Sequence, residues 1–186
     1  YEAAFAGSKN QIFILSDSDS EFKRLYLYDI DNQTNRKVGK DYNWDASGLK
    51  VSHDASRVAY VLNESGYSRL ILIEVESGLE IPTPEVCGVL SHYEFTHNNG
   101  LLFAYQNSVQ ASDCYLLPPV SKVFQQLTFS SYQGLNQSLF VEPELIEYPS
   151  FDGLQIPAFL FLPKNYRSKS TIPMVLHFHG GPEGQF

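Results

Sequence analysis

The sequence predicts a mainly β chain, in which a partial β-propeller of about three blades is followed by a region of different character. Three observations predict this class. Aromatic residues make up 14% of the 186 residues, and this composition favours strands over helices. Short β-rich runs recur with a period of about 45 residues, and helical spacing is nearly absent before residue 145.

The first landmark of the repeat is an apolar run that ends in an acidic residue and a last apolar residue. Leu25–Ile30 aligns with Leu70–Val75, 45 positions later, with apolar matched to apolar and acid to acid. A weaker copy follows after a further 45 positions at Tyr115–Val120. The period is therefore visible in three successive units.

The second landmark is a polar turn that leads into a short β-rich run. Such turns precede Ile12–Leu15, Val58–Leu62 and Leu101–Tyr105, at offsets of 46 and 44 positions. A further run at Lys122–Thr128 is expected to close the last unit. Two independent landmarks thus share one period.

Repeats of this length that contain only strands are typical of propeller blades, each a sheet of four strands. The alternative is an irregular β-sandwich with chance internal similarity. The units span residues 1 to 140, whereas closed propellers have about 4 to 8 blades. A repeat sheet needs neighbours to bury its faces, so we expect these units to be the end of a longer propeller.

Composition and charge exclude some classes of partner. The net charge is −8, from 13 Lys and Arg against 21 Asp and Glu, and this disfavours binding to duplex nucleic acid. No apolar run approaches the roughly 20 residues of a membrane span, and no charged-then-apolar leader opens the sequence. The protein is therefore expected to be cytoplasmic, or its leader lies upstream of these residues.

Cysteines and histidines give no evidence for a disulfide framework or a metal site. Cys87 and Cys114 are expected to be buried thiols, with a single disulfide as the alternative. His177 and His179 would face one side of a strand, but no nearby acid or cysteine completes a ligand set. We therefore expect no metal and no cofactor.

The period fails after Val141, and the sequence changes character there. Gly153 lies in a turn between two predicted strands, where it can supply a positive φ. The expected elements are a linker at 142–144, strands at 145–148 and 155–162 and, after a polar loop, a buried strand at 172–178.

The predicted last strand leads directly into His179-Gly180-Gly181-Pro182. Because glycine has no Cβ, a glycine pair lets backbone N–H groups point into open space. Such amides can stabilise the oxyanion of an acyl-transfer reaction, and a loop of this kind follows a strand in α/β-hydrolases. The alternative is an ordinary Gly-Gly-Pro turn.

These last residues resemble the start of the peptidase domain of the prolyl oligopeptidase family, in its acylaminoacyl-peptidase and dipeptidyl-aminopeptidase-like branch. Residues 1 to 140 are similar to the propeller of that family only in period and pattern. The resemblance implies propeller blades at 1–141 and the start of an α/β-hydrolase domain at 142–186. The motifs that carry it are Glu147-Tyr148-x-Ser150-x-Asp152-Gly153, Ile156-Pro157-Ala158, Pro163, Pro173-Met174-Val175-Leu176 and His179-Gly180-Gly181-Pro182.

The resemblance implies a serine peptidase in which the propeller covers the catalytic domain and admits short peptides or acyl-peptides to a Ser-Asp-His triad, without a cofactor. The backbone N–H of Gly181 would be an oxyanion donor. His179 stands where other branches place a tyrosine, and it would brace the loop or assist the oxyanion.

No Gly-x-Ser-x-Gly nucleophile motif occurs in the 186 residues. In the family the triad residues come later in the hydrolase domain, so the chain alone is expected to be inactive. Two other hypotheses remain open: a non-catalytic propeller that acts as an interaction module, and a propeller-capped esterase. An exposed edge on the strand at 172–178 would also favour oligomerisation.

Overall fold

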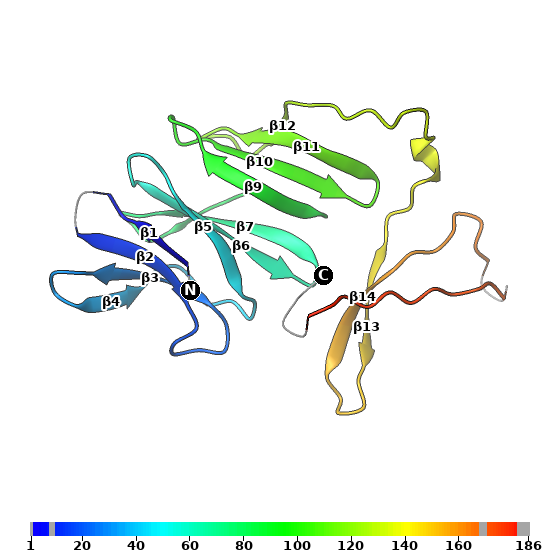
Figure 1. Ribbon diagram of the computed structural model, residues 1–186, viewed down its shortest axis with the longest axis horizontal. Coiled ribbons are helices and arrows are strands. Elements are labelled where there is room, and N and C mark those ends of the chain that lie inside the picture. The colour runs from blue at the N-terminus through cyan, green and yellow to red at the C-terminus, as the bar shows by residue number, and fades with distance from the viewer. Residues whose placement is uncertain (1, 8–9, 168–170, 182–186) are drawn as a thin grey trace.

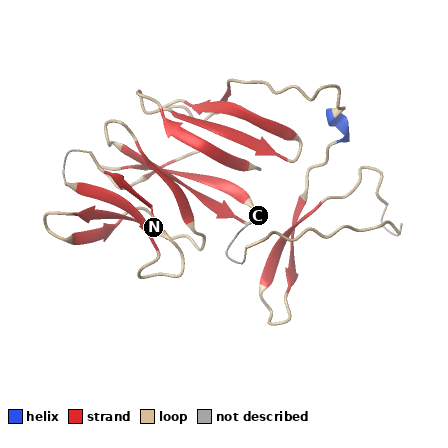
Figure 2. Ribbon diagram, viewed as in Figure 1, coloured by secondary structure: helices blue, strands red, loops and turns tan. Residues whose placement is uncertain are grey.

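The computed structural model describes residues 2–7, 10–167 and 171–181. The described chain is nearly all β, with three four-stranded antiparallel sheets and one two-stranded sheet (Figure 2). The one helix among the described residues is a 3-10 turn, η1 (Gln137–Leu139). No described helix is long and apolar enough to cross a membrane. The predicted class, mainly β with a propeller-type repeat, is confirmed.

Each four-stranded sheet is a simple meander whose strands pair in chain order (Figure 1). The first sheet contains β1 (Glu2–Phe5), β2 (Gln11–Ser16), β3 (Arg24–Asp29) and β4 (Thr34–Lys37). The second contains β5 (Ala46–Val51), β6 (Arg57–Glu64), β7 (Tyr67–Glu74) and β8 (Glu80–Ile81). The third contains β9 (Val89–Phe95), β10 (Leu101–Asn107), β11 (Gln110–Leu117) and β12 (Gln125–Gln126).

The second sheet is buried on both faces, since it lies between the other two. Val58, Tyr60 and Leu62 of β6 pack into a core shared with the first sheet. Ala59 and Val61, which alternate with them, pack into a core shared with the third sheet. Side chains of a strand point alternately to its two faces, so burial on both faces accounts for the unbroken apolar run of β6.

After the third sheet the chain forms an isolated hairpin of β13 (Glu144–Pro149) and β14 (Gln155–Leu160), which confirms the two strands expected here. Gly153 has φ +88°, as its turn position requires, and the Leu154 amide donates to Asp152. The rings of Tyr67, at the start of β7, and Phe159 of β14 lie 5.0 Å apart between centroids. This aromatic contact joins the hairpin to the second sheet.

The expected buried strand at 172–178 is wrong. Residues 171–181 form no strand, and Val175 and Leu176 are 91% and 65% exposed. A buried strand is held by ladder hydrogen bonds to neighbours on both sides, and none of the described strands pairs with this segment. Its β propensity alone therefore does not make it a strand.

The expectation of buried thiols is also wrong, because Cys87 and Cys114 are both free and exposed. Cys87 lies in the loop before β9. Cys114 alternates along β11 with Tyr115, which is buried against the second sheet, so it points to the opposite, uncovered face of the third sheet.

Candidate functional site

The predicted oxyanion loop lies outside the propeller-like sheets, in the extended segment 171–181. Gly180 and Gly181 are exposed, and neither belongs to a described strand. A Cβ built on Gly180 would meet nothing within 4 Å, so the space in front of this backbone is open. Pro182 lies outside the described residues.

His179 is turned toward its own loop. Its Nδ1 lies 2.8 Å from the carbonyl oxygen of Gly180, so in one tautomer the imidazole donates to this carbonyl. The role expected for His179, bracing the loop or assisting the oxyanion, remains a prediction. The sequence expectation for Gly181 itself, a backbone N–H available to an oxyanion, remains a prediction.

The loop carries no nucleophile of its own. An oxyanion donor contributes only when a nucleophile has attacked a carbonyl, because only then does negative charge develop on the oxygen. Among the described residues there is also no group of three or more His, Cys, Asp or Glu side chains that could hold a metal ion.

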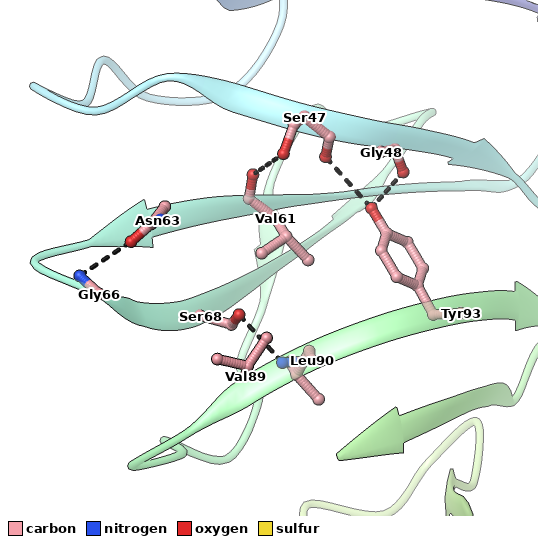
Figure 3. Close-up of a pocket in the computed structure, with 9 residues that line it drawn as sticks. All are labelled: Ser47, Gly48, Val61, Asn63, Gly66, Ser68, Val89, Leu90 and Tyr93. Atoms are coloured by element: carbon pink, nitrogen blue, oxygen red, sulfur yellow. Dashed lines mark hydrogen bonds between the residues drawn. The ribbon is translucent and has the colours of Figure 1, made fainter. Parts of the chain in front are cut away.

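A separate cavity of about 390 Å³ lies between the second and third sheets (Figure 3). Its polar groups are largely engaged with one another: Ser68 Oγ accepts from the Leu90 amide at 3.0 Å, and Asn63 Oδ1 accepts from the Gly66 amide at 2.8 Å. The cavity is lined only by uncharged residues, namely Ser47, Gly48, Val61, Asn63, Gly66, Ser68, Val89, Leu90 and Tyr93.

Sequence reasoning missed this cavity. Its walls come from strands of two repeats, and none of its lining residues belongs to a recognisable motif. Only the packing of β9 against β5 and the β6–β7 hairpin brings them together, as Figure 3 shows. Its lining suits an uncharged group rather than an ion.

The fold and the glycine-containing segment together define the class of this protein. It has a propeller-type repeat of four-stranded sheets, followed by a hairpin and an exposed His-Gly-Gly segment.

No family model matches the chain. Over 178 residues it is 21% identical to a probable dipeptidyl-peptidase 5 of Aspergillus flavus, covering 90% of this chain and 24% of the relative. It is 30% identical over 71 residues to the uncharacterised peptidase YuxL of Bacillus subtilis, covering 38% of this chain and 11% of that protein.

Solved structures show the same fold. Puromycin hydrolase matches with a TM-score of 0.80 at 15% identity, over 97% of this chain and 29% of that one. A prolyl endopeptidase matches with a TM-score of 0.74 at 13% identity, over 90% and 25% of the two chains. These findings confirm the resemblance to the prolyl oligopeptidase family. The chain spans about a quarter of the length of the peptidases to which most of its length aligns.

Proposed function

We propose that the chain is part of a serine-type peptidase that hydrolyses short peptides or acyl-peptides. Residues 1–141 would be blades of the propeller that limits access to the active site, and residues 142–186 would begin the α/β-hydrolase domain. The observation that carries the proposal is the exposed glycine pair, which follows the sheets of a chain whose relatives are peptidases.

In this reaction the backbone N–H of Gly181 donates to the oxygen of the tetrahedral intermediate. A donor that is already in place costs little reorganisation as charge develops, so it stabilises the transition state more than the bound peptide. His179 acts as a positioning residue through its contact with the Gly180 carbonyl. The serine that attacks, and its histidine and aspartate partners, would lie outside these 186 residues.

The chain alone should be inactive, because its sequence contains no Gly-x-Ser-x-Gly motif. Incubation with a fluorophosphonate probe tests this, since such probes label an activated serine. We expect no specific labelling of the 186-residue chain. Labelling of one serine, lost after heat denaturation, would overturn this part of the proposal.

The oxyanion role is tested in a longer form of the protein that includes the triad. Gly181→Pro removes the N–H donor and also excludes the observed φ of +153°, so we expect kcat to fall by at least about 100- to 1,000-fold. Gly180→Ala is the matched control, because its side chain would enter open space. Equal activity of Gly181→Pro and the parent would contradict the role of this amide.

Substrate profiling separates the peptidase from the two other hypotheses. Faster hydrolysis of acyl-peptides than of simple esters supports the peptidase, whereas the reverse order supports a propeller-capped esterase. If the longer natural sequence has another residue in place of the nucleophilic serine, this would support the hypothesis of a non-catalytic interaction module.

A further inference from the structure

Two imidazole rings stack at the junction of the second and third sheets. His53 lies in the turn after β5 and His97 in the turn after β9, with ring centroids 4.5 Å apart and planes inclined by 22°. Both residues are exposed. The 44 positions between them correspond to one period of the repeat, so the fold brings together two histidines that are distant in the sequence.

The two turns occupy the same place in consecutive sheets, each after the first strand. The Ser52 amide donates to the Arg57 carbonyl at 2.9 Å, and the Thr96 amide donates to the Gly100 carbonyl at 2.8 Å. Each pair closes the turn that follows the first strand of its sheet. His53 and His97 therefore occupy corresponding places in consecutive repeats.

Side-chain bonds hold one turn against the other. Asn99 Nδ2 donates to Asp54 Oδ2 at 2.7 Å, and Arg57 Nη1 donates to the Asn99 carbonyl at 3.1 Å. The first bond joins the turn after β5 to the turn after β9, and the second joins Arg57, the first residue of β6, to the turn after β9. The backbones that carry the imidazoles are thus fixed relative to each other, which reduces the entropy lost when both rings engage one ligand.

The pair is specific to this junction among the three described sheets. In the first sheet the corresponding turn is closed by the Ala6 amide and the Gln11 carbonyl, 2.9 Å apart, and the residue after Ala6 is Gly7. A Cβ on Gly7 would lie 2.9 Å from the Cβ of Ala55, so the close approach of the sheets leaves no room for a side chain there. The neighbouring junction therefore has no imidazole pair.

We propose that His53 and His97 together bind one divalent transition-metal ion of the Zn²⁺ or Cu²⁺ type. Neutral imidazole is a preferred ligand of these ions. The exposed rings can turn about χ2 to direct one nitrogen each at the ion, and solvent completes the coordination shell. With two protein ligands the site is exchangeable, and the bound ion links the second sheet to the third.

Asp54 supports this site without being a ligand. Its Oδ1 accepts from Ser52 Oγ and from the amide and hydroxyl of Ser56, at 2.8 to 3.0 Å, while its Oδ2 accepts from Asn99. Its negative charge, beside His53 in the sequence, favours a cation at the pair.

The test is isothermal titration of the 186-residue chain with ZnCl₂ and CuCl₂, and it does not depend on peptidase activity. We expect one ion per chain, release by EDTA, and a higher midpoint of thermal unfolding with the metal bound. MgCl₂ should not bind, because Mg²⁺ prefers oxygen ligands. Failure of the parent chain to bind Zn²⁺ and Cu²⁺ would overturn the proposal.

The variants His53→Ala and His97→Ala should each weaken binding by about tenfold or more, with His53→Gln and His97→Gln as replacements should an alanine variant not fold. His92→Ala is the matched control. His92 is an exposed histidine of β9 whose Nδ1 contacts Ser91 Oγ at 3.1 Å, outside the stacked pair. Unchanged binding in the His53 and His97 variants, or equal loss in His92→Ala, would contradict the assignment.

Discussion

The hydroxyl of Tyr93, on the third sheet, donates a hydrogen bond to the carbonyl of Gly48, on the second. Gly48 lies at a bulge of β5, between the pairs Ser47–Val61 and Lys50–Ala59, with φ +71°. A Cβ at this position would lie 2.6 Å from the Tyr93 hydroxyl oxygen. Burial raises the pKa of Tyr93, so the hydroxyl stays protonated as a donor over the ordinary pH range.

Replacing Gly48 by alanine should therefore destabilise the contact between the sheets. We expect Gly48→Ala to lower the free energy of unfolding by about 2 to 4 kcal/mol, from the left-handed backbone strain and the displacement of Tyr93. Urea unfolding followed by the fluorescence of Trp44 measures this. Gly78→Ala is the matched control, with φ +69° but nothing within 4 Å of its Cβ, and it should lose only about 1 kcal/mol. Equal losses would show that Tyr93 is not displaced.

The first sheet reaches the same bulge from the other side. The Glu2 carboxylate accepts from the amides of Gly48 and Leu49 at 2.9 and 2.8 Å. We expect Glu2→Ala to cost about 1 to 3 kcal/mol, since both amides lose a charged acceptor, and Glu2→Gln to cost less because its carbonyl still accepts. The same urea assay applies. Glu21→Ala, at an exposed position, is the control, and a loss there as large as in Glu2→Ala would contradict the role of the bulge.

The sequence predicted the strands that contain an apolar run, and it missed the polar strand β4 and most of the edge strand β12. The apolar runs became β2, β3, β6, β7, β10 and β11. β4 (Thr34–Lys37) is polar and all four of its residues are exposed, so no periodicity marks it. Of the run Lys122–Thr128 only Gln125–Gln126 pairs as β12. Strands at the outer edge of a sheet are held by ladder bonds rather than by apolar burial, and a hydrophobic pattern cannot reveal them.

The candidate sites also differ in how far a sequence pattern can predict them. The glycine pair at 180–181 could be found because it is contiguous in the sequence, whereas the strand expected before it depended on neighbours that no pattern specifies. His53 and His97 had one usable signal, a spacing that matches the repeat period. The cavity beside Tyr93 had none, since it forms only when the second and third sheets pack.

Asp54 should make the stability of the contact between the second and third sheets sensitive to acid. Its hydrogen bond from Asn99, followed by those from Ser56 and Ser52, holds the pKa of the carboxyl well below its usual range. A group whose folded-state pKa is lowered stabilises the fold above its unfolded pKa, near 4, and this stabilisation is lost as the pH falls below that value. The urea midpoint of the parent should therefore exceed that of Asp54→Asn at pH 7, and the difference should shrink by pH 2.5.

The control for this pH dependence is Asp152→Asn. The pKa of Asp152 is also lowered, first by the Leu154 amide, but the carboxylate bonds only within its own hairpin turn. Trp44 packs against the core of the first two sheets, and its fluorescence should not respond to this change. A difference between parent and Asp54→Asn that stays constant from pH 7 to pH 2.5 would contradict the assigned shift.

The Tyr67–Phe159 contact should hold the β13–β14 hairpin against the second sheet. We expect Phe159→Ala to expose the segment between β12 and β13 to limited proteolysis, with faster cleavage and an unchanged urea midpoint by Trp44 fluorescence, because the contact lies outside the cores of the sheets. Phe161→Ala, at a position that is 54% exposed, is the control and should be cleaved at the rate of the parent. Unchanged proteolysis of Phe159→Ala would show that the ring contact does not restrain the hairpin.

The exposed segment 171–181 should drive self-association. Met174, Val175 and Phe178 are 75%, 91% and 75% exposed, and soluble monomers rarely expose so many neighbouring apolar side chains. A β-prone apolar segment without a strand partner can pair with the same segment of a second copy. We expect the molar mass from light scattering to rise with concentration, and the double variant Val175→Lys with Leu176→Lys to remain monomeric because it places charge in the paired segment. Leu154→Lys, at an exposed turn, is the control. It tests whether a lysine added outside segment 171–181 also prevents self-association. A parent chain that stays monomeric at high concentration would show that the segment does not self-pair.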